Sequence, residues 1–459
     1  MTPARLRWLV EAGSPTLELA SLFASAGYSL YLVGGSVRDA FLDRTPEDLD
    51  FATDATPAEI KTVVTKWADA VYGVGEAFGT IGVRQGDFVA EITTFRSEIY
   101  RDDSRKPRVT FSSDIENDLS RRDFSVNAIA LRLPDLEAVD PFGGLADLAQ
   151  GLLRTPLDPE ISFSDDPLRM LRLFRFQATL DFRIDPDAEA AVGRMAERIS
   201  IVSAERIRDE ISKLVVAPTP GSALAGVVRS GLAAFFLPEL PALAMEQDPL
   251  HQHKDVLAHT LAVVDKTNPE LVLRMAALMH DVGKPATRSY GPEGVTFHHH
   301  EVVGQRITRE RLRALRFPND TVEMIARLVF LHLRPHTLKM GWTDSAVRRY
   351  VRDAGPLLER LNELVRRDVT TANKRKADMI NERIDELEAR IADLAERESL
   401  DRLRPPINGH QVMEFLNVPP GPLIGEVMEM LYERRIEDGP YTEEEAYELV
   451  KNWWDARGT

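Results

Sequence analysis

The sequence has 459 residues, of which 44% are hydrophobic and 28% are charged, and it contains no cysteine. The length predicts about three domains, the composition excludes a disordered chain, and the lack of cysteine excludes disulfides and thiolate metal sites. The net charge of −16 argues against a protein that coats nucleic acid nonspecifically, although it is compatible with an enzyme that has a local basic groove.

The opening of the sequence is short and amphipathic and lacks the features of a signal peptide, and no apolar run reaches 18 residues. We therefore expect a cytoplasmic protein without a membrane partner, which agrees with the absence of cysteine.

The first third of the chain predicts short strands mixed with helices. Residues 1–25 predict a helix, and Pro57 after Thr56 predicts the start of another over 58–68. The polar stretch 97–117 predicts a mobile loop or flap with a little strand. Short apolar or β-branched runs between Gly, Asp or Pro predict strands at 29–33, 49–52, 80–84, 88–94 and 128–133.

After residue 144 the strand signals fade, and from about residue 165 the chain predicts helices separated by prolines. The fold class is therefore α+β in the N-terminal part and all-α beyond it. One apolar seam along residues 379–394 predicts a helix that packs on a neighbour. The interruptions place domains at 1–155, 156–218, 219–375 and 376–459.

The stretch 31–50 holds the first candidate site. Gly34 and Gly35 interrupt an apolar run, and glycine allows backbone N–H groups to approach a phosphate closely. Asp48 and Asp50 are two residues apart, so on a strand their carboxylates point to one side. Carboxylate pairs of this kind bind Mg²⁺ in phosphoryl-transfer sites. Each signal alone is weak, and their combination predicts nucleotidyl transfer.

The second candidate cluster lies at residues 118–128. Arg121 and Arg122 are adjacent there, and arginine forks grip phosphate through two parallel hydrogen bonds. Asp123 and Asn127 follow and could bond ribose hydroxyls. The alternative for this segment alone is a capped helix start with a solvated run of charges.

The third candidate cluster follows Asp165. The residues Asp166, Arg169, Arg172 and Arg175 are spaced by three and on a helix would form a slanting stripe. An aspartate beside arginines offers both acceptors and donors, so it could read the Watson–Crick edge of cytosine or adenine. The alternative is a ladder of surface ion pairs.

Histidines cluster between residues 251 and 336, far more than scatter would produce. Imidazoles and carboxylates that converge from several helices form divalent metal sites, which activate water for phosphoester hydrolysis. The candidate ligands are His259, the pair His280-Asp281, the run His298-His299-His300, His332 and Asp368.

Five motifs occur in a characteristic order: GGSVRD with Asp48-Leu49-Asp50, LSRRDFSVNA, DPFGG, DDPLRMLRLFRF and Ser203-Ala204-Glu205-Arg206-Ile207. In order and spacing they closely resemble class II CCA-adding enzymes, over residues 28–215. These tRNA nucleotidyltransferases share a polymerase-β-like superfamily with bacterial poly(A) polymerases. The resemblance implies a head with a small mixed sheet, followed by all-α neck, HD-like and tail regions.

The resemblance implies that Gly35 and Arg38 contact the nucleotide phosphates and that Asp48 and Asp50 bind Mg²⁺. Glu91 is a possible third carboxylate.

For the second cluster, the resemblance implies that Arg122 contacts the triphosphate, and that Asp123 and Asn127 lie on the sugar side.

For the third cluster, the resemblance implies that Asp166 and Arg169 select CTP and then ATP in place of a nucleic-acid template, and that Arg172 and Arg175 complete the pocket. Asp165 stands where the family usually has Glu, with little expected effect.

Residues 250–370 resemble the HD metal-dependent phosphohydrolase domain that is appended to some bacterial members, with either a transition metal or Mg²⁺ at the site. The resemblance implies the metal ligands His259, His280, Asp281, His300, His332 and Asp368. Residues 407–436 resemble the family's C-terminal tail segment. The expected partners are tRNA, CTP and ATP, and the expected state is a monomer or a homodimer.

Three alternatives remain, two of them within the same class of enzyme and one from another class. The first is poly(A) polymerase, and the second is an enzyme that adds only the terminal A. The third takes the HD domain as the main activity, a metal phosphohydrolase acting on cyclic or other phosphoesters. A noncatalytic RNA-binding protein is disfavoured by the intact carboxylate pair.

Overall fold

The computed structural model describes residues 4–46, 48–73, 75–99, 108–111, 114–245, 255–291, 294–337, 342–369, 374–398 and 404–457. Two compact units divide the chain, Met1–Pro241 and Ala242–Thr459. Within the described residues, no helix is long and apolar enough to cross a membrane. The finer division into four domains stays a prediction.

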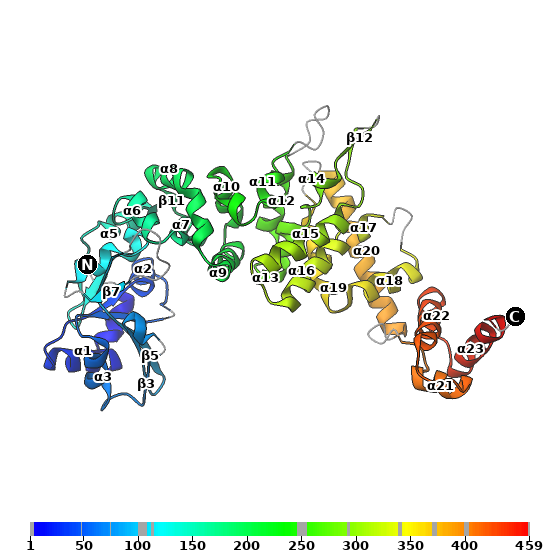
Figure 1. Ribbon diagram of the computed structural model, residues 1–459, viewed down its shortest axis with the longest axis horizontal. Helices are drawn as coiled ribbons and strands as arrows, with labels where there is room; N and C mark the ends of the chain where they lie inside the picture. The colour runs from blue at the N-terminus through cyan, green and yellow to red at the C-terminus, as the bar shows by residue number, and fades with distance from the viewer. Residues whose placement is uncertain are drawn as a thin grey trace. The chain divides into compact units, whose positions relative to one another are not determined.

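The first unit contains a mixed sheet of seven strands, as expected for the head (Figure 1). β2 runs parallel to β5 and antiparallel to β1, so the predicted mixed sheet is confirmed. In spatial order the strands are β3 (Ala70–Tyr72), β4 (Thr80–Gln85), β5 (Phe88–Thr94), β2 (Asp50–Thr53), β1 (Leu30–Val33), β8 (Ala130–Arg132) and β9 (Glu137–Val139).

Helices α1 (Pro15–Ser25) and α3 (Pro57–Val64) pack against the sheet and against each other. The expected single helix over 1–25 was wrong, because Pro15 starts α1 after its cap Ser14 and a 3₁₀ helix, η1 (Ala4–Val10), precedes it. α3 begins at the predicted proline, since Thr56 and Glu59 form a capping box, but it ends earlier than expected.

The predicted strands are confirmed with shifts of one or two residues, whereas the short strands β3 and β9 of the same sheet were not predicted. Within the stretch 97–117, the structure places the hairpin β6 (Arg96–Ile99) and β7 (Arg108–Phe111) and the start of α4 (Ile115–Ser120). The predicted mobile loop between these strands lies outside the described residues.

The rest of the first unit is mainly helical, with helices both between the strands in the chain and after them. Gly226 lets α10 approach α7 closely, since a Cβ at this position would lie 2.5 Å from the Phe174 ring. The helices are α2 (Gly35–Phe41), α5 (Gly144–Gln150), α6 (Pro159–Asp165), α7 (Leu168–Leu180), α8 (Pro186–Met195), α9 (Ala204–Val215), α10 (Pro220–Arg229) and α11 (Glu239–Ala242), with the 3₁₀ helices η2 (Glu76–Phe78), η3 (Ser125–Asn127), η4 (Ala196–Ile201) and η5 (Leu232–Phe235) and a short parallel pair, β10 (Leu152–Leu153) and β11 (Arg183–Ile184).

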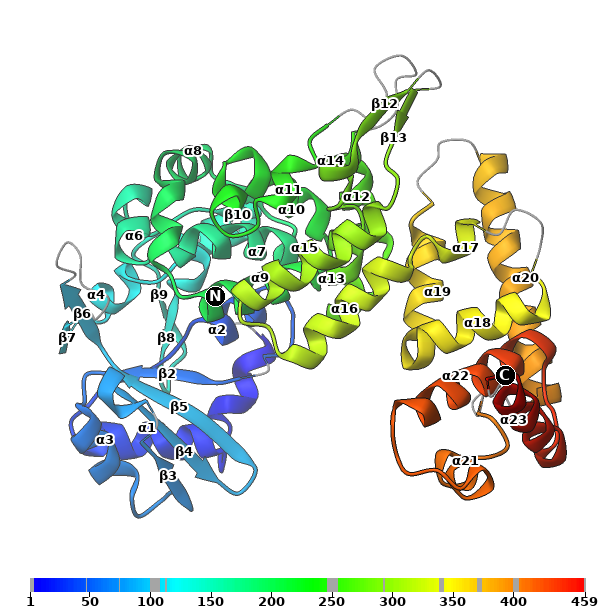
Figure 2. The same cartoon turned by 45° about the vertical axis from the view of Figure 1, so that its right-hand side comes forward.

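In the part of the second unit that the structure describes, all elements are helical apart from one hairpin, β12 (Ser289–Gly291) and β13 (Gly294–Thr296), which Figure 2 labels. Its elements are α12 (Val256–Lys266), α13 (Leu271–Met279), α14 (Lys284–Thr287), α15 (His300–Ala314), α16 (Asn319–Leu331), α17 (Arg334–Thr337), α18 (Asp344–Ala354), η6 (Gly355–Leu357), α19 (Leu358–Arg367), α20 (Lys374–Glu398), α21 (Gly409–Leu416), α22 (Pro422–Asp438) and α23 (Glu443–Arg457).

The predicted helix over 379–394 is confirmed as part of α20, which packs on α18 and α19. Ile384, Leu387 and Leu394 form its buried seam, as expected, while Met379 is exposed and lies outside it. The last three helices enclose a small apolar core of their own around Val412, Val427, Leu431 and Val450.

Candidate active site and metal centre

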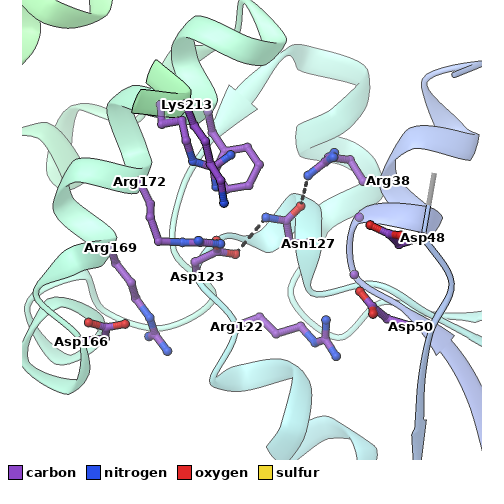
Figure 3. A pocket seen from close by; sticks show the side chains of 14 residues that line it. Arg38, Asp48, Asp50, Arg122, Asp123, Asn127, Asp166, Arg169, Arg172 and Lys213 are labelled. Carbon is purple, nitrogen blue, oxygen red and sulfur yellow. Dashed lines mark hydrogen bonds and ion pairs between the residues drawn. The ribbon is translucent and has the colours of Figure 1, made fainter. Parts of the chain in front are cut away.

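The first candidate site is a cavity of about 650 Å³ in the first unit (Figure 3). It brings together every residue predicted for nucleotide binding, although these residues come from three separate stretches of sequence. Its lining is Gly34, Gly35, Arg38, Asp48, Asp50, Arg122, Asp123, Asn127, Asp166, Arg169, Arg172, Arg175, Phe176 and Lys213.

Asp48 and Asp50 form the acidic wall of this cavity. Asp50 begins β2, whereas Asp48 precedes the strand, so the expectation that both lie on it was wrong. Both side chains nevertheless line the cavity, on one side of the view in Figure 3. Glu91 on β5 pairs in register with Asp50 on the adjacent parallel strand β2. Three carboxylates therefore gather at this end of the sheet.

The Asp50 carboxyl reflects this crowding. Although it reaches solvent, surrounding protein atoms partly desolvate it and raise its pKa. The charges of Glu91 and Asp48 raise its pKa further, while Arg122 lowers it. A divalent cation would relieve this repulsion, and an all-oxygen donor set fits Mg²⁺.

Gly34 joins β1 to α2 at the edge of the cavity. Its φ of +76° favours glycine, and a Cβ there would lie 3.0 Å from Nη1 of Arg122 and 3.6 Å from Oδ2 of Asp50. Arg122 also donates to Asp118 at 3.2 Å. The glycine therefore leaves room for an arginine fork close to the carboxylates.

A chain of hydrogen bonds crosses the floor of the cavity. Arg38 donates to Oδ1 of Asn127 at 2.8 Å, and Nδ2 of Asn127 donates to Asp123 at 2.9 Å (Figure 3). Asp123 also accepts from Arg172 at 2.6 and 3.0 Å. Burial alone would raise the pKa of Asp123, but Arg172 and Asn127 outweigh it and lower the pKa to about 2.

Arg172 and Arg175 on α7 share a second buried carboxylate. Glu210 of α9 accepts from Arg172 at 3.1 Å and from Arg175 at 2.5 Å. The Arg175 guanidinium also stacks 4.0 Å from the centre of the Phe176 ring. These bonds fix the forks toward the cavity instead of leaving them as a solvated ladder.

Asp166 is placed differently from the expected helical stripe. It lies between α6 and α7 in an extended conformation, so the stripe on α7 holds only the three arginines. Each of these arginines bonds to residues outside the stripe. Arg169 donates to Oγ of Ser162 at 2.9 Å and to the backbone carbonyl of Arg121. Asp166 pairs instead with Arg206 of α9, at 2.7 Å.

Four residues of this site were not predicted from the sequence: Phe176, Arg206, Glu210 and Lys213. Arg206 falls in the fifth motif, which contributed to the family resemblance but to which no role was assigned. Glu210 and Lys213 lie four and seven residues later, on the same face of α9, and that spacing was the available signal.

The second candidate site gathers all six predicted metal ligands in the second unit. They form two groups in which the ligand atoms lie within 4.8 Å of one another, His259 with His280 and Asp368, and Asp281 with His300 and His332.

Backbone carbonyls orient the buried imidazoles. Nδ1 of His280, His300 and His332 lies 2.8, 2.9 and 2.6 Å from the carbonyl three residues earlier in each case. A carbonyl only accepts, so Nδ1 carries the proton and Nε2 points to the centre. The Nε2 atoms of His300 and His332 then face each other at 3.3 Å. This arrangement is typical of metal ligands.

The carboxylates of this centre favour positive charge beside them. Burial lowers the pKa of His280, but Asp281 and Asp368 outweigh it and raise the pKa to about 10. Burial and the neighbouring imidazoles lower the pKa of His332 to about 3. Lys284 donates to Asp281 at 2.7 Å. The donor set of nitrogens and carboxylates therefore fits a divalent cation.

Three stretches of the chain match known protein families. Residues 30–154 match the poly A polymerase head domain, and residues 181–243 match the probable RNA and SrmB-binding site of polymerase A. Residues 255–401 match the HD domain.

Individual relatives match either most of this chain or about half of it. The A-adding tRNA nucleotidyltransferase of Deinococcus radiodurans is 32% identical over 92% of this chain and 95% of its own length. The CCA-adding enzyme of Lactobacillus gasseri is 39% identical, over 53% of this chain and 59% of its own length.

Among solved structures, the CCA-adding enzyme of Bacillus stearothermophilus in complex with CTP matches with a TM-score of 0.70 and 26% identity, covering 100% of this chain and 99% of that one. By its sequence, its sheet and its helical regions, the chain belongs to the family of tRNA nucleotidyltransferases that contains the CCA-adding and A-adding enzymes.

Proposed function

We propose that this protein adds nucleotides to the 3′ end of tRNA from CTP and ATP, with its own side chains choosing the base. The observation that carries this proposal is the single cavity that joins an acidic wall to a row of arginines. An acidic wall suits the reacting phosphate and its metal, and arginine forks suit the rest of a triphosphate.

Asp48 and Asp50, with Glu91 beside them, would hold Mg²⁺, which stabilises charge on phosphate oxygens when it is bound. Arg38 and Arg122 line the same cavity and would bind the phosphates, so that the tRNA 3′-hydroxyl can attack the α-phosphate and pyrophosphate can leave. Positioning and electrostatics supply most of the catalysis in reactions of this class.

Asp123 and Asn127 would set the sugar side, because their bonds to Arg172 and Arg38 fix them in place. Asp166 and Arg169 would read the base. A carboxylate accepts from the exocyclic amino groups that cytosine and adenine share, and uracil and guanine carry a carbonyl at that position.

The product can be C, C and A or the terminal A alone. The name of the Deinococcus relative favours the A-only product, while the CCA-adding enzyme of Anoxybacillus flavithermus, 29% identical over 88% of the chain, favours the full sequence. Transcripts that end at the discriminator base, at C and at CC separate these products. Growth of the first on CTP supports full addition, growth of only the last on ATP supports A-addition, and a long tail of A supports poly(A) polymerase.

A second activity is proposed for the histidine centre, hydrolysis of cyclic or other phosphoesters. The six converging donors support it. Turnover of a 2′,3′-cyclic phosphodiester with Ni²⁺, Mn²⁺ or Mg²⁺ that is lost in Asp281→Ala would support this activity. Absence of both bound metal and turnover in the wild type would leave the domain a structural role.

A further inference from the structure

Helix α9 carries charged residues along the face that meets the cavity. Arg206, Glu210 and Lys213 are spaced by four and three residues and therefore share this face. Arg206 bonds to Asp166, Glu210 bonds to two arginines of α7, and Lys213 lines the cavity. The helix thus supports residues that the proposed function places around the nucleotide.

The two oxygens of Asp166 have different partners. Oδ2 accepts from Nη2 of Arg206 at 2.7 Å, and Oδ1 accepts from the backbone N–H of Leu168 at 3.1 Å. Two donors on different elements fix the plane of a carboxylate. Each oxygen keeps a lone pair, so the fixed group can still accept a further hydrogen bond.

A fixed acceptor discriminates between bases. Cytosine and adenine present an amino donor where uracil and guanine present a carbonyl acceptor. A carboxylate held in place accepts a hydrogen bond from cytosine or adenine and repels the carbonyl oxygen of uracil or guanine. A carboxylate that can rotate avoids this repulsion, so it discriminates less between the bases. Discrimination then depends on what holds the carboxylate.

We propose that Arg206 is a positioning residue that holds the Asp166 carboxylate and thereby sets the preference for ATP over GTP and for CTP over UTP. This inference rests on the proposed role of Asp166 in base reading. Arg206 acts from α9, through Asp166.

The ion pair is suitable for mutation, because the Arg206 side chain is 53% exposed and half-exposed pairs contribute little to stability. The chain offers a matched control in Arg194 of α8. Its Nε lies 2.7 Å from Glu160, its side chain is 57% exposed, and neither residue lines the cavity. Arg194→Ala therefore removes a comparable ion pair from the same unit.

The test measures kcat/KM for each nucleotide on a tRNA transcript ending at CC, and on one ending at C for the CTP and UTP pair if the wild type adds C. The ratio of ATP to GTP, unlike either value alone, is independent of the amount of folded enzyme. In Arg206→Ala we expect this ratio to fall about tenfold, the usual effect of one charge-assisted hydrogen bond. Arg206→Lys should restore part of the ratio, and Arg194→Ala should leave it unchanged.

An unchanged ratio in Arg206→Ala would overturn the inference, and so would an equal fall in Arg194→Ala. Asp166→Asn distinguishes this failure from failure of the proposed function. If Asp166→Asn lowers the ratio and Arg206→Ala does not, base reading stands and the role of Arg206 is wrong. If neither variant changes the ratio, the base-reading role of Asp166 is itself wrong.

Discussion

The two candidate sites of this protein differ in how they present their acidic groups. In the nucleotide cavity Asp48 and Asp50 reach solvent, and nearby arginines belong to a hydrogen-bonded frame. In the histidine centre the imidazoles of His280 and His332 and the carboxyl of Asp281 are buried, each 1% exposed. The candidate metal ligands of the first site are carboxylate oxygens only, whereas those of the second are imidazole nitrogens and carboxylate oxygens.

This difference indicates different uses of a metal. Exposed oxygens suit Mg²⁺, which keeps waters and shares its coordination with substrate phosphates. A buried set of oriented imidazoles suits an ion that stays with the protein. Variants in one site should therefore leave the chemistry of the other intact.

The largest expected effect is the loss of nucleotide addition in Asp50→Ala. Removing one metal-binding carboxylate costs several kcal/mol of transition-state stabilisation, so the rate should fall by roughly a thousandfold or more. Single-turnover addition on a truncated tRNA measures this. Binding of tRNA should persist, and metal content of the histidine centre should not change. Wild-type addition in this variant would contradict the assignment.

The histidine run offers the reciprocal test. His300→Ala removes a buried donor, whereas His298→Ala removes an exposed neighbour from the same run. After exchange into Ni²⁺ or Mn²⁺ and desalting, we expect elemental analysis to find metal lost in the first variant and retained in the second. Both should add nucleotides at the wild-type rate. Equal metal content in the two variants would argue against the centre.

The buried ion pair between Asp123 and Arg172 should contribute to the free energy of unfolding. Asp123→Asn removes charge from a carboxylate that accepts two bonds from Arg172, and we expect a loss of about 2 kcal/mol in the free energy of unfolding at pH 7.

The contribution of Asp123 should also depend on pH. Its folded pKa of about 2 lies below the unfolded value of 3.8, so its stabilisation is present above pH 4 and is lost as the pH falls toward 2. Urea unfolding of the wild type and of Asp123→Asn across this range checks the sign. A difference between them that grows on acidification would refute it.

The smallest expected effect separates backbone strain from crowding. Gly34 and Gly27 have φ of +76° and +85°, but only a Cβ at Gly34 would approach Arg122, while Gly27 has open space. Alanine at either position should cost about 1 kcal/mol of stability. Only Gly34→Ala should also slow nucleotide addition, because its Cβ would displace Arg122. We expect a fall of about tenfold, the usual effect of losing one charge-assisted hydrogen bond. Equal rates in the two variants would mean that the close approach is unimportant.

Much of the head could be predicted from sequence because its signals are local. Gly34 has a positive φ that favours glycine, Pro57 starts a helix, and turn residues separate the five predicted strands. The convergence of the candidate residues at both sites was also predictable, because several carboxylates, arginines and histidines recur in combination at characteristic spacings.

Partners between distant helices could not be predicted in the same way. Arg206 reaches Asp166 across 40 residues, and Glu210 reaches Arg172 across 38. Which of several arginines a carboxylate takes depends on how α9 packs on α7, and no local pattern encodes that choice. The expected four-member stripe was wrong for a related reason, because Asp166 ends one helix and cannot join the next.

The central claim is that side chains of this protein choose the nucleotide, with no nucleic-acid template. Its most direct measurement is single-turnover addition by the wild type to tRNA transcripts that end at the discriminator base, at C and at CC, with each of the four nucleotides alone. We predict addition of A to the transcript ending at CC, strong exclusion of UTP and GTP, and no growth beyond the terminal A. Comparable use of all four nucleotides, or no addition to any transcript, would contradict the claim.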